Sequence, residues 1–362
     1  MLQSVRETGI VERIEIPRHS MICKLLALKA VCVLCLMISE GHAGSEKGPL
    51  SVTNRFPPHL LFLKPVPDSP RTLPGNSFEM SLSADYSSTF VNETSEERSV
   101  LADMEMSVSE LSVRYGATEY LSLSADIPVF SMNAGFLDGF LADFHKTLGV
   151  GNYGRETRPE DTFAYSLKKN GKEQFDAESG GLHFGDISLS AKLSLMDEKN
   201  GILKSGSSYS RFFPESIALS YILKLPVGSK DRGLGSGGFD HGLFLLSQFR
   251  LFPSLLIYLN PGILLLSDPE VDLSFSNKIF AFFWGGEYLL NESWSFFAQW
   301  NYYTSPFENT GIRQLDEDSL ELQSGFSCAL TQSLNFEFAF CEDLTRSEPD
   351  FNVHTRFVYR FE

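Results

Sequence analysis

The amino-acid sequence predicts an all-β protein, an antiparallel up-and-down transmembrane β-barrel of about 12 strands with a helix-containing long extracellular loop. Apolar and polar residues alternate along successive segments, as in strands whose two faces meet different surroundings. Aromatic residues make up 13% of a chain with a formal net charge of −16. No long apolar helix is predicted after residue 43. A barrel explains both properties, because its outer face is apolar and its lumen polar on the same strands.

Residues 1–43 are expected to be absent from the folded protein. Lys24 and Lys29 precede an apolar run over residues 30–38, and small residues around Ala43 fit a cleavage site. The run is far shorter than the roughly 20 residues of a membrane-spanning helix. The residues upstream of it resemble no targeting segment. We therefore interpret this region as a non-native upstream extension plus a cleaved signal peptide.

Composition after residue 43 argues against several partners and sites. Removing five basic and four acidic side chains takes the formal net charge from −16 to −17, which disfavours nucleic acid as a partner because phosphates are bound by Lys and Arg. Only Cys328 and Cys341 remain, with opposite predicted phases on adjacent strands, so we expect no mutual disulfide. Without a paired histidine motif they also predict no zinc site. We expect no metal and no cofactor.

The strands are predicted from alternating runs. The five clearest cover residues 78–86, 104–115, 121–129, 187–195 and 217–225. Seven less regular runs complete the even number typical of single-chain bacterial barrels: residues 243–251, 255–266, 279–290, 294–302, 320–330, 334–340 and 350–362. Within the second run the apolar phase changes between Val108 and Leu111, which predicts a bulge near Glu110.

The last strand carries a signal for the cellular compartment. Its aromatic-rich pattern resembles the terminal strand of bacterial outer-membrane barrels, although Glu362 follows the last aromatic residue. We expect this strand to close the barrel against residues 78–86. Arg356 and Arg360 should then point into the lumen. The side chains expected to face lipid are Phe351, Phe357, Tyr359 and Phe361.

The connections predict the orientation. Those at residues 116–118, 252–254, 291–293 and 331–333 are short and alternate with longer ones, and short turns of outer-membrane barrels are periplasmic. Both termini are then periplasmic in the outer membrane of a Gram-negative bacterium. Residues 197–214 form a long connection on the short side without an evident reason. The expected partners are outer-membrane lipid, lipopolysaccharide and the barrel-assembly machinery.

The domain organisation follows from these patterns. Residues 77–362 form the predicted outer-membrane barrel. Residues 44–76 contain seven prolines, which supply no ladder hydrogen bonds and predict an extended segment. The apolar stretch 60–63 leaves two interpretations open: a periplasmic lead-in, or a plug inside the lumen.

The longest outer connection, residues 131–182, contains apolar residues at helical spacing. A short amphipathic helix is expected there, acting either as a constriction of the lumen or as a cap without a gating role. The residues assigned to the constriction are Phe136, Leu137, Phe140, Leu141 and Phe144.

Charged and polar residues fall on the predicted lumen face. They either line an aqueous path or pair across a closed interior, and a barrel of 12 strands lies between the filled and the open size classes. The predicted lumen-lining residues are Glu79, Asp85, Asp126, Asp186, Lys192, Lys224, Gln299, Glu321, Glu337, His354, Arg356 and Arg360.

Two loops carry a resemblance to a known family. At Gly135-Phe136-Leu137-Asp138-Gly139-Phe140, at Phe144-His145, at Leu225-Pro226-Val227-Gly228 and over residues 233–240, the chain resembles the bacterial envelope family called domain of unknown function 3187. The resemblance extends from Asn54 and Pro57 to the last strand. It implies an envelope barrel but no reaction, substrate or catalytic residue.

Other sites are weighed against simpler interpretations. The glycine-rich residues 227–242 lack the Lys and Ser of a phosphate loop, so they predict a flexible connection or a calcium site between Asp231 and Asp240. Lipid hydrolysis would require His183 with Ser188 or Ser190, outside any recognised catalytic pattern. We assign no catalytic residue and expect no enzyme.

The expected function is a restricted passive channel for small solutes. The alternative is a non-conducting structural or surface barrel, whose acidic outer residues bind divalent cations of the lipopolysaccharide layer. Those residues are Asp316, Glu317 and Asp318.

Overall fold

The computed structural model describes residues 46–148, 154–198, 200–204, 213–270, 272 and 274–361. The predicted leader, residues 1–43, lies outside them, as does Glu362. Part of the connection at 197–214 is likewise outside the described residues.

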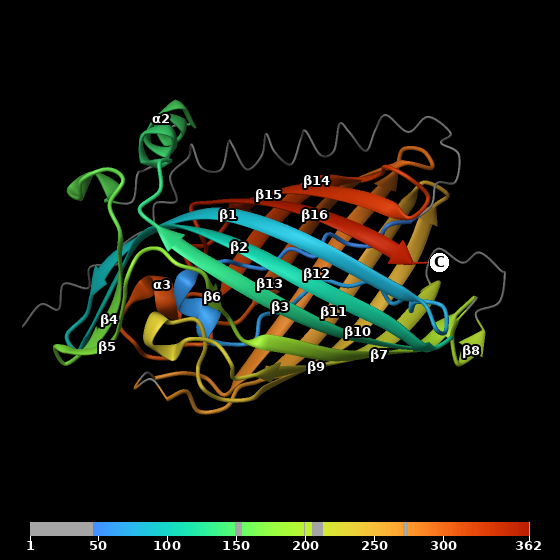
Figure 1. Cartoon of the computed structure of the whole chain (residues 1–362), viewed down its shortest axis with the longest axis horizontal. Helices are drawn as coiled ribbons and strands as arrows, with labels where there is room; N and C mark the ends of the chain where they lie inside the picture. The colour runs from blue at the N-terminus through green and yellow to red at the C-terminus, as the bar shows by residue number, and fades with distance from the viewer. Residues whose placement is uncertain are drawn as a thin grey trace, which may run out of the picture.

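Twelve antiparallel strands close into a barrel, and each of them pairs with one strand on either side (Figure 1). The predicted fold class is therefore confirmed. The ring consists of β1 (Phe78–Thr94), β2 (Arg98–Thr118), β3 (Leu121–Asn133), β7 (Ile187–Asp197), β9 (Ser216–Leu225), β10 (Asp240–Phe252), β11 (Leu255–Leu265), β12 (Lys278–Leu289), β13 (Trp294–Tyr303), β14 (Ser319–Ala329), β15 (Leu334–Asp343) and β16 (Phe351–Phe361).

Shorter elements attach to one end of this ring. The hairpin of β4 (Ala164–Lys169) and β5 (Lys172–Ala177) continues the sheet beside β2, and β6 (His183–Phe184) pairs with β3. At the other end β8 (Leu203–Lys204) pairs with β7. The helices are η1 (Pro57–Leu61), α2 (Asp138–Leu148), η2 (Arg155–Thr157), η3 (Lys230–Arg232) and α3 (Arg313–Asp316). No described helix has the length and apolar character needed to cross a membrane.

The first and last strands close the barrel as predicted. Phe78 pairs with Phe361, and the register continues without interruption to Ser88 and Phe351. On this pair most apolar residues point outward, as shown by the exposed side chains of Leu82 and Phe357. Most inward-facing residues are polar and buried, with Val358 beside Ser81 as an apolar exception. The period of two therefore produces an apolar outer surface and a polar interior.

The predicted bulge near Glu110 is wrong. Glu110 pairs in regular register with Ser83 and with Pro128, and the register shift of β2 lies at its end, between Gly116 and Thr118. The apolar phase changes because Met104, Met106 and Val108 face inward, where they are buried, whereas Leu111, Val113 and Tyr115 face outward. The same strand buries its apolar side chains in the interior at one end and exposes them outside at the other.

The two cysteines lie on opposite faces of the β14–β15 pair. Cys328 is opposite Trp294 on the outward face, and Cys341 is opposite Gln323 on the inward face. Both are buried free thiols.

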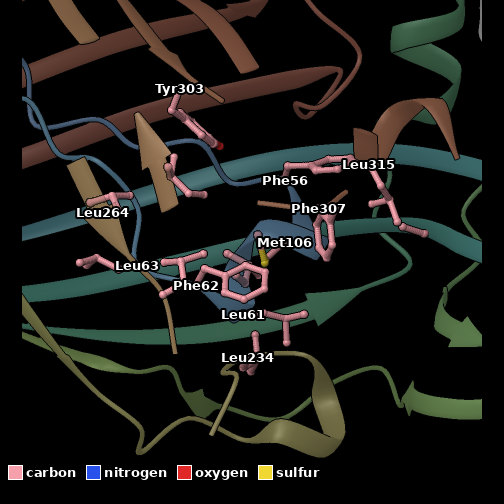
Figure 2. Packing of buried hydrophobic residues seen from close by; sticks show 14 of the residues in the cluster. Phe56, Leu61, Phe62, Leu63, Met106, Leu234, Leu264, Tyr303, Phe307 and Leu315 are labelled. Carbon is pink, nitrogen blue, oxygen red and sulfur yellow. The ribbon is translucent and has the colours of Figure 1, made fainter. Parts of the chain in front are cut away.

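The main apolar core lies inside one end of the barrel, around η1 (Figure 2). Phe56, Leu61, Phe62 and Leu63 contribute to it from the N-terminal segment. The strands and connections contribute the labelled residues Met106, Leu234, Leu264, Tyr303, Phe307 and Leu315. The interior is therefore occupied by the chain itself.

Candidate functional site: the barrel lumen and its N-terminal segment

Residues 46–75, which we call the lumenal segment, run through the barrel interior (blue in Figure 1). The ascending leg, residues 47–55, lies against the inner wall of β12 to β16. The chain turns at η1 and returns as the descending leg, residues 63–75, beside β10, β7 and β3. Irregular backbone at this depth is acceptable only where its polar groups find partners.

Side chains of the inner wall supply those partners to the ascending leg. Glu287 accepts hydrogen bonds from the backbone N–H groups of Lys47 at 2.8 Å and Gly48 at 3.2 Å. The amide of Gln299 accepts from the N–H of Leu50 at 3.0 Å and donates to its carbonyl at 2.9 Å. A single glutamine thus replaces the hydrogen bonds of a neighbouring strand.

An ionic cluster fixes the end of the ascending leg. The Arg55 guanidinium lies 2.6 Å from an Asp85 carboxylate oxygen, and both side chains are buried, at 2% and 0% exposure. His354 Nδ1 lies 2.7 Å from the other Asp85 oxygen. Glu110 is 3.8 Å from Arg55. Asp85 therefore has two partners that can donate hydrogen bonds to it.

The turn at η1 is held by aromatic contacts. His59 lies between Phe56 and Phe307, with ring centroids 5.1 and 5.9 Å away, and its Nδ1 is 2.8 Å from the Tyr303 hydroxyl. His59 is buried, and desolvation lowers the pKa of its imidazole to about 3. The ring is therefore neutral.

The descending leg is held by both ion pairs and backbone hydrogen bonds. Asp68 lies 2.8 Å from the Lys192 ammonium and 3.5 Å from the Arg114 guanidinium. The N–H of Leu73 donates to the Ser122 hydroxyl at 2.9 Å. These contacts fix the leg to β2, β3 and β7 near the end that carries the short turns.

A cavity of about 120 Å³ lies between the descending leg and one side of the barrel. Charged lining residues include Lys64, Glu110, Arg114 and Asp126. Eight serines also line it: Ser51, Ser81, Ser83, Ser112, Ser124, Ser188, Ser190 and Ser220. A single water needs roughly 10–15 Å³ of such space, so the cavity has room for about ten waters or one small solute.

The two sides of the barrel interior are packed differently. On β13 and β14 the inward-facing side chains are fully covered, including Gln299 and Gln323 at 1% and 0% exposure. On β2, β3 and β7 the inward-facing Ser112, Ser124 and Ser190 are half-buried and border the cavity. The lumenal segment therefore seals one wall and leaves space along the other.

The predicted lumen-lining residues lie in these layers. Lys224 bridges Asp186 at 2.7 Å and Asp240 at 3.1 Å, and it donates to the carbonyl of Leu61. Asp126 accepts from Ser112 at 2.5 Å. Two further ion pairs contain predicted residues: Glu79 lies 2.8 Å from Arg360, and Glu337 lies 3.4 Å from Arg356. Glu321 is buried beside Gln323. The contacts of Asp85, Lys192, Gln299 and His354 are those described above.

The loop helix exists as predicted, as α2, but its contacts lie on the outer rim. Phe136 stacks on Tyr86 with ring centroids 5.7 Å apart, and Phe140 meets Phe351 at 6.4 Å. Tyr86 and Phe351 point outward, and Phe136 and Phe140 are 70% and 55% exposed. In Figure 1 the helix stands away from the ring of strands. We therefore do not propose it as the constriction.

The other constriction residues fit this placement. Leu141 is buried, and the N–H of Leu137 donates to the Glu105 carboxylate at 2.5 Å. Glu105 faces outward from β2 and is covered by this connection. The side chain of Phe144 lies outside the described residues.

The two alternative sites find little support in the geometry. His183 Nε2 lies 3.1 Å from the carbonyl of Gly180, and no hydrogen bond joins it to Ser188 or Ser190 among the described residues. Asp240 is occupied by Lys224 and by the N–H of Leu63. The described part of the chain contains no group of three or more His, Cys, Asp or Glu placed to hold a metal ion.

Comparison with known proteins identifies the family. The model of a family described as protein of unknown function (DUF3187) matches residues 24–361. The chain belongs to this family. No curated protein matches it.

The chain is also similar to solved structures at low sequence identity. An outer membrane channel from Pseudomonas putida F1 has 14% identity and a TM-score of 0.49, over 80% of this chain and 97% of that one. The CymD monoaromatic hydrocarbon channel has 12% identity and a TM-score of 0.37, over 79% and 88%. The NanC porin has 9% identity and a TM-score of 0.41, over 78% and 99%.

In this family member, sequence reasoning missed the residues that border the cavity from the lumenal segment. Lys64 and Asp68 lie in a proline-rich stretch without periodicity, so no pattern assigned them a face. Ser112, Ser124 and Ser190 do carry a signal, because each falls on the inward phase of its strand. A search for small polar residues on one phase of adjacent strands would have found them.

Proposed function

We propose that this member of the DUF3187 family is an outer-membrane β-barrel that acts as a restricted passive channel for small solutes. The outer face of the strands is apolar and exposed, which supports a lipid environment. In a soluble barrel this face would be buried or would carry polar and charged side chains. The polar interior supports an aqueous path. We assign the short turns and both ends of the chain to the periplasm.

The observation that carries the proposal is the unequal filling of the lumen. The lumenal segment packs tightly on β12 to β16, whereas a serine-lined cavity of about 120 Å³ remains beside β2, β3 and β7. Residues 46–75 would then act as a fixed plug that narrows the barrel to this one side. Solutes no larger than the cavity would pass along the serines.

A cavity-filling substitution tests the path. Ser124 and Ser190 face each other across β3 and β7 with hydroxyl oxygens 2.5 Å apart, and both border the cavity. Ser124→Phe should strongly reduce single-channel conductance in planar bilayers, because the ring fills the space left for water.

The matched control is Ser324→Phe. Ser324 lies between Ala298 and Phe340 on the outward face of β14, so its substitution should leave conductance unchanged. Equal conductance of Ser124→Phe and the parent would show that ions do not use this cavity.

A non-conducting structural barrel is the second candidate. The contacts between the ascending leg and the inner wall favour this alternative. Glu287, Gln299 and Arg55 hold the segment in place, so it is not readily displaced from the lumen. An absence of channel events from correctly folded parent protein would select this alternative.

A further inference from the structure

The cavity has two chemically different ends. Towards η1 its lining includes the apolar side chains of Phe62, Phe130 and Phe244 beside the Lys224–Asp186 ion pair. Towards the short turns it is lined by serines and charged groups. A solute that fills the whole cavity therefore needs both an apolar part and a polar part. An apolar group placed against the charged residues would displace their water without offering a hydrogen bond in return.

A cation with spare donors borders the boundary between these ends. The Lys64 ammonium lies 6.0 Å from the centroid of the Phe130 ring. It makes no hydrogen bond or ion pair with any residue in the described part of the chain. Its side chain is half-buried and lines the cavity. An ammonium carries three hydrogen-bond donors, so the Lys64 side chain can bind a carboxylate placed here.

Two carboxylates lie close to this cation. Glu110 is opposite Pro128, and Asp126 is opposite Ser112, which puts both acids on the inward face of neighbouring strands. Diagonal neighbours of this kind are about 7–8 Å apart. Glu110 has one ionic contact, at 3.8 Å from Arg55, and Asp126 has its hydrogen bond from Ser112. Two like charges so placed favour a cationic group between them.

Phe130, beneath Lys64, is two residues beyond Pro128 on β3, a rise of about 7 Å. The cation therefore lies further along the same inner surface than the two carboxylates, and a solute bound by all three carries a positive and a negative group.

We propose that the cavity is a binding site for small zwitterions of the α-amino acid type with an apolar side group. The solute ammonium lies between Glu110 and Asp126, its carboxylate binds Lys64, and its side group packs on Phe130 towards η1. This deepens the channel function proposed above, on which it rests, by naming a solute class.

Calorimetric titration of the folded protein in detergent tests the site without requiring conduction. The probes are phenylalanine, 3-phenylpropanoate, which lacks the ammonium, and 2-phenylethylamine, which lacks the carboxylate. Phenylalanine should bind about tenfold or more tightly than either analogue, because each analogue leaves one charged partner unmatched.

Variants assign the two ends of the solute. Lys64→Gln should remove the advantage of phenylalanine over 2-phenylethylamine, and Lys64→Arg should retain it. Glu110→Gln should remove the advantage over 3-phenylpropanoate. Lys168→Gln, on the exposed β4, should change none of these affinities.

Either equal affinity of all three probes for the parent, or an unchanged order of affinities in Lys64→Gln, would overturn the assignment. Conductance of the parent in planar bilayers is measured separately. Channel events without zwitterion binding would refute this site alone, whereas binding without channel events would refute the channel and leave a binding barrel.

Discussion

At the scale of single residues, the barrel interior depends on buried charges that complete one another. Arg55 reaches Asp85 from the lumenal segment, and His354 reaches the same carboxylate from β16. Taking such groups out of water costs free energy that close pairing offsets, and losing one partner leaves the other unmatched. The cluster therefore links the N-terminal segment to the strands that close the barrel.

Arg55→Met should lower the free energy of unfolding by about 3–5 kcal/mol, because Asp85 then stays buried with only His354 as a partner. Urea unfolding in lipid vesicles measures this change. As a control, Lys168→Met breaks the Lys168–Glu173 pair, which is 41% and 53% exposed, and should leave the free energy of unfolding nearly unchanged. Equal effects of the two substitutions would contradict the role of the buried cluster.

At the scale of elements, the lumenal segment behaves as an inner layer without a strand partner of its own. Glutamine and glutamate side chains supply the hydrogen bonds that a neighbouring backbone would otherwise provide. Leu50 and Val52 add apolar contact with Phe297, Ala339 and Cys341. Polar wall residues are thus structural where the segment covers them, and they are available to solutes only beside the cavity.

Gln299→Ala should loosen the ascending leg, because both backbone groups of Leu50 lose their partners at a cost of about 1–3 kcal/mol each. The measurement is maleimide labelling of Cys341 in a Cys328→Ser chain beginning at residue 44. Cys341 is 3% exposed beneath the leg, so labelling should be slow in the parent and faster in the variant. Gln174→Ala, on β5, should not change the rate, and an unchanged rate for Gln299→Ala would show that the leg is held elsewhere.

At the scale of the whole molecule, closure between β1 and β16 removes the last free edges of the ring. A sheet that stayed open would leave unpaired backbone groups, which lipid cannot satisfy. The continuous register from Phe78 with Phe361 to Ser88 with Phe351 meets this requirement.

Val358→Pro should prevent closure, since Val358 pairs with Ser81 on β1 and with Asn335 on β15 and proline cannot donate to a ladder. The folded fraction, read from heat-modifiable migration on gels, should fall strongly. Val358→Ala keeps the N–H group and should fold like the parent. Normal folding of the proline variant would mean that β16 is not essential to closure.

The strands could be predicted because the alternation of apolar and polar residues along each strand depends on the surroundings of that strand's own two faces. Alternation along β1 and β16 predicted their faces and their pairing, and helical spacing predicted α2. Helical spacing does not say which surface a helix covers, so a constriction of the lumen and a cap without a gating role both stayed open. The contacts of Phe136 and Phe140 lie on the outer rim. The wrongly predicted bulge at Glu110 has a similar origin. Apolar residues that move from the inner to the outer face of a strand give the same sequence pattern as a bulge that shifts the register.

The sequence by itself determined the closed barrel, its strand number and the two faces of its wall, because these follow from a period of two repeated along neighbouring segments. Only the tertiary structure decided that residues 46–75 occupy the lumen and that space remains beside Lys64, Glu110 and Ser124. Proline-rich backbone has no periodicity that reveals its partners. Those partners are single side chains, such as Gln299, about 250 residues further along the chain, and only folding brings them together.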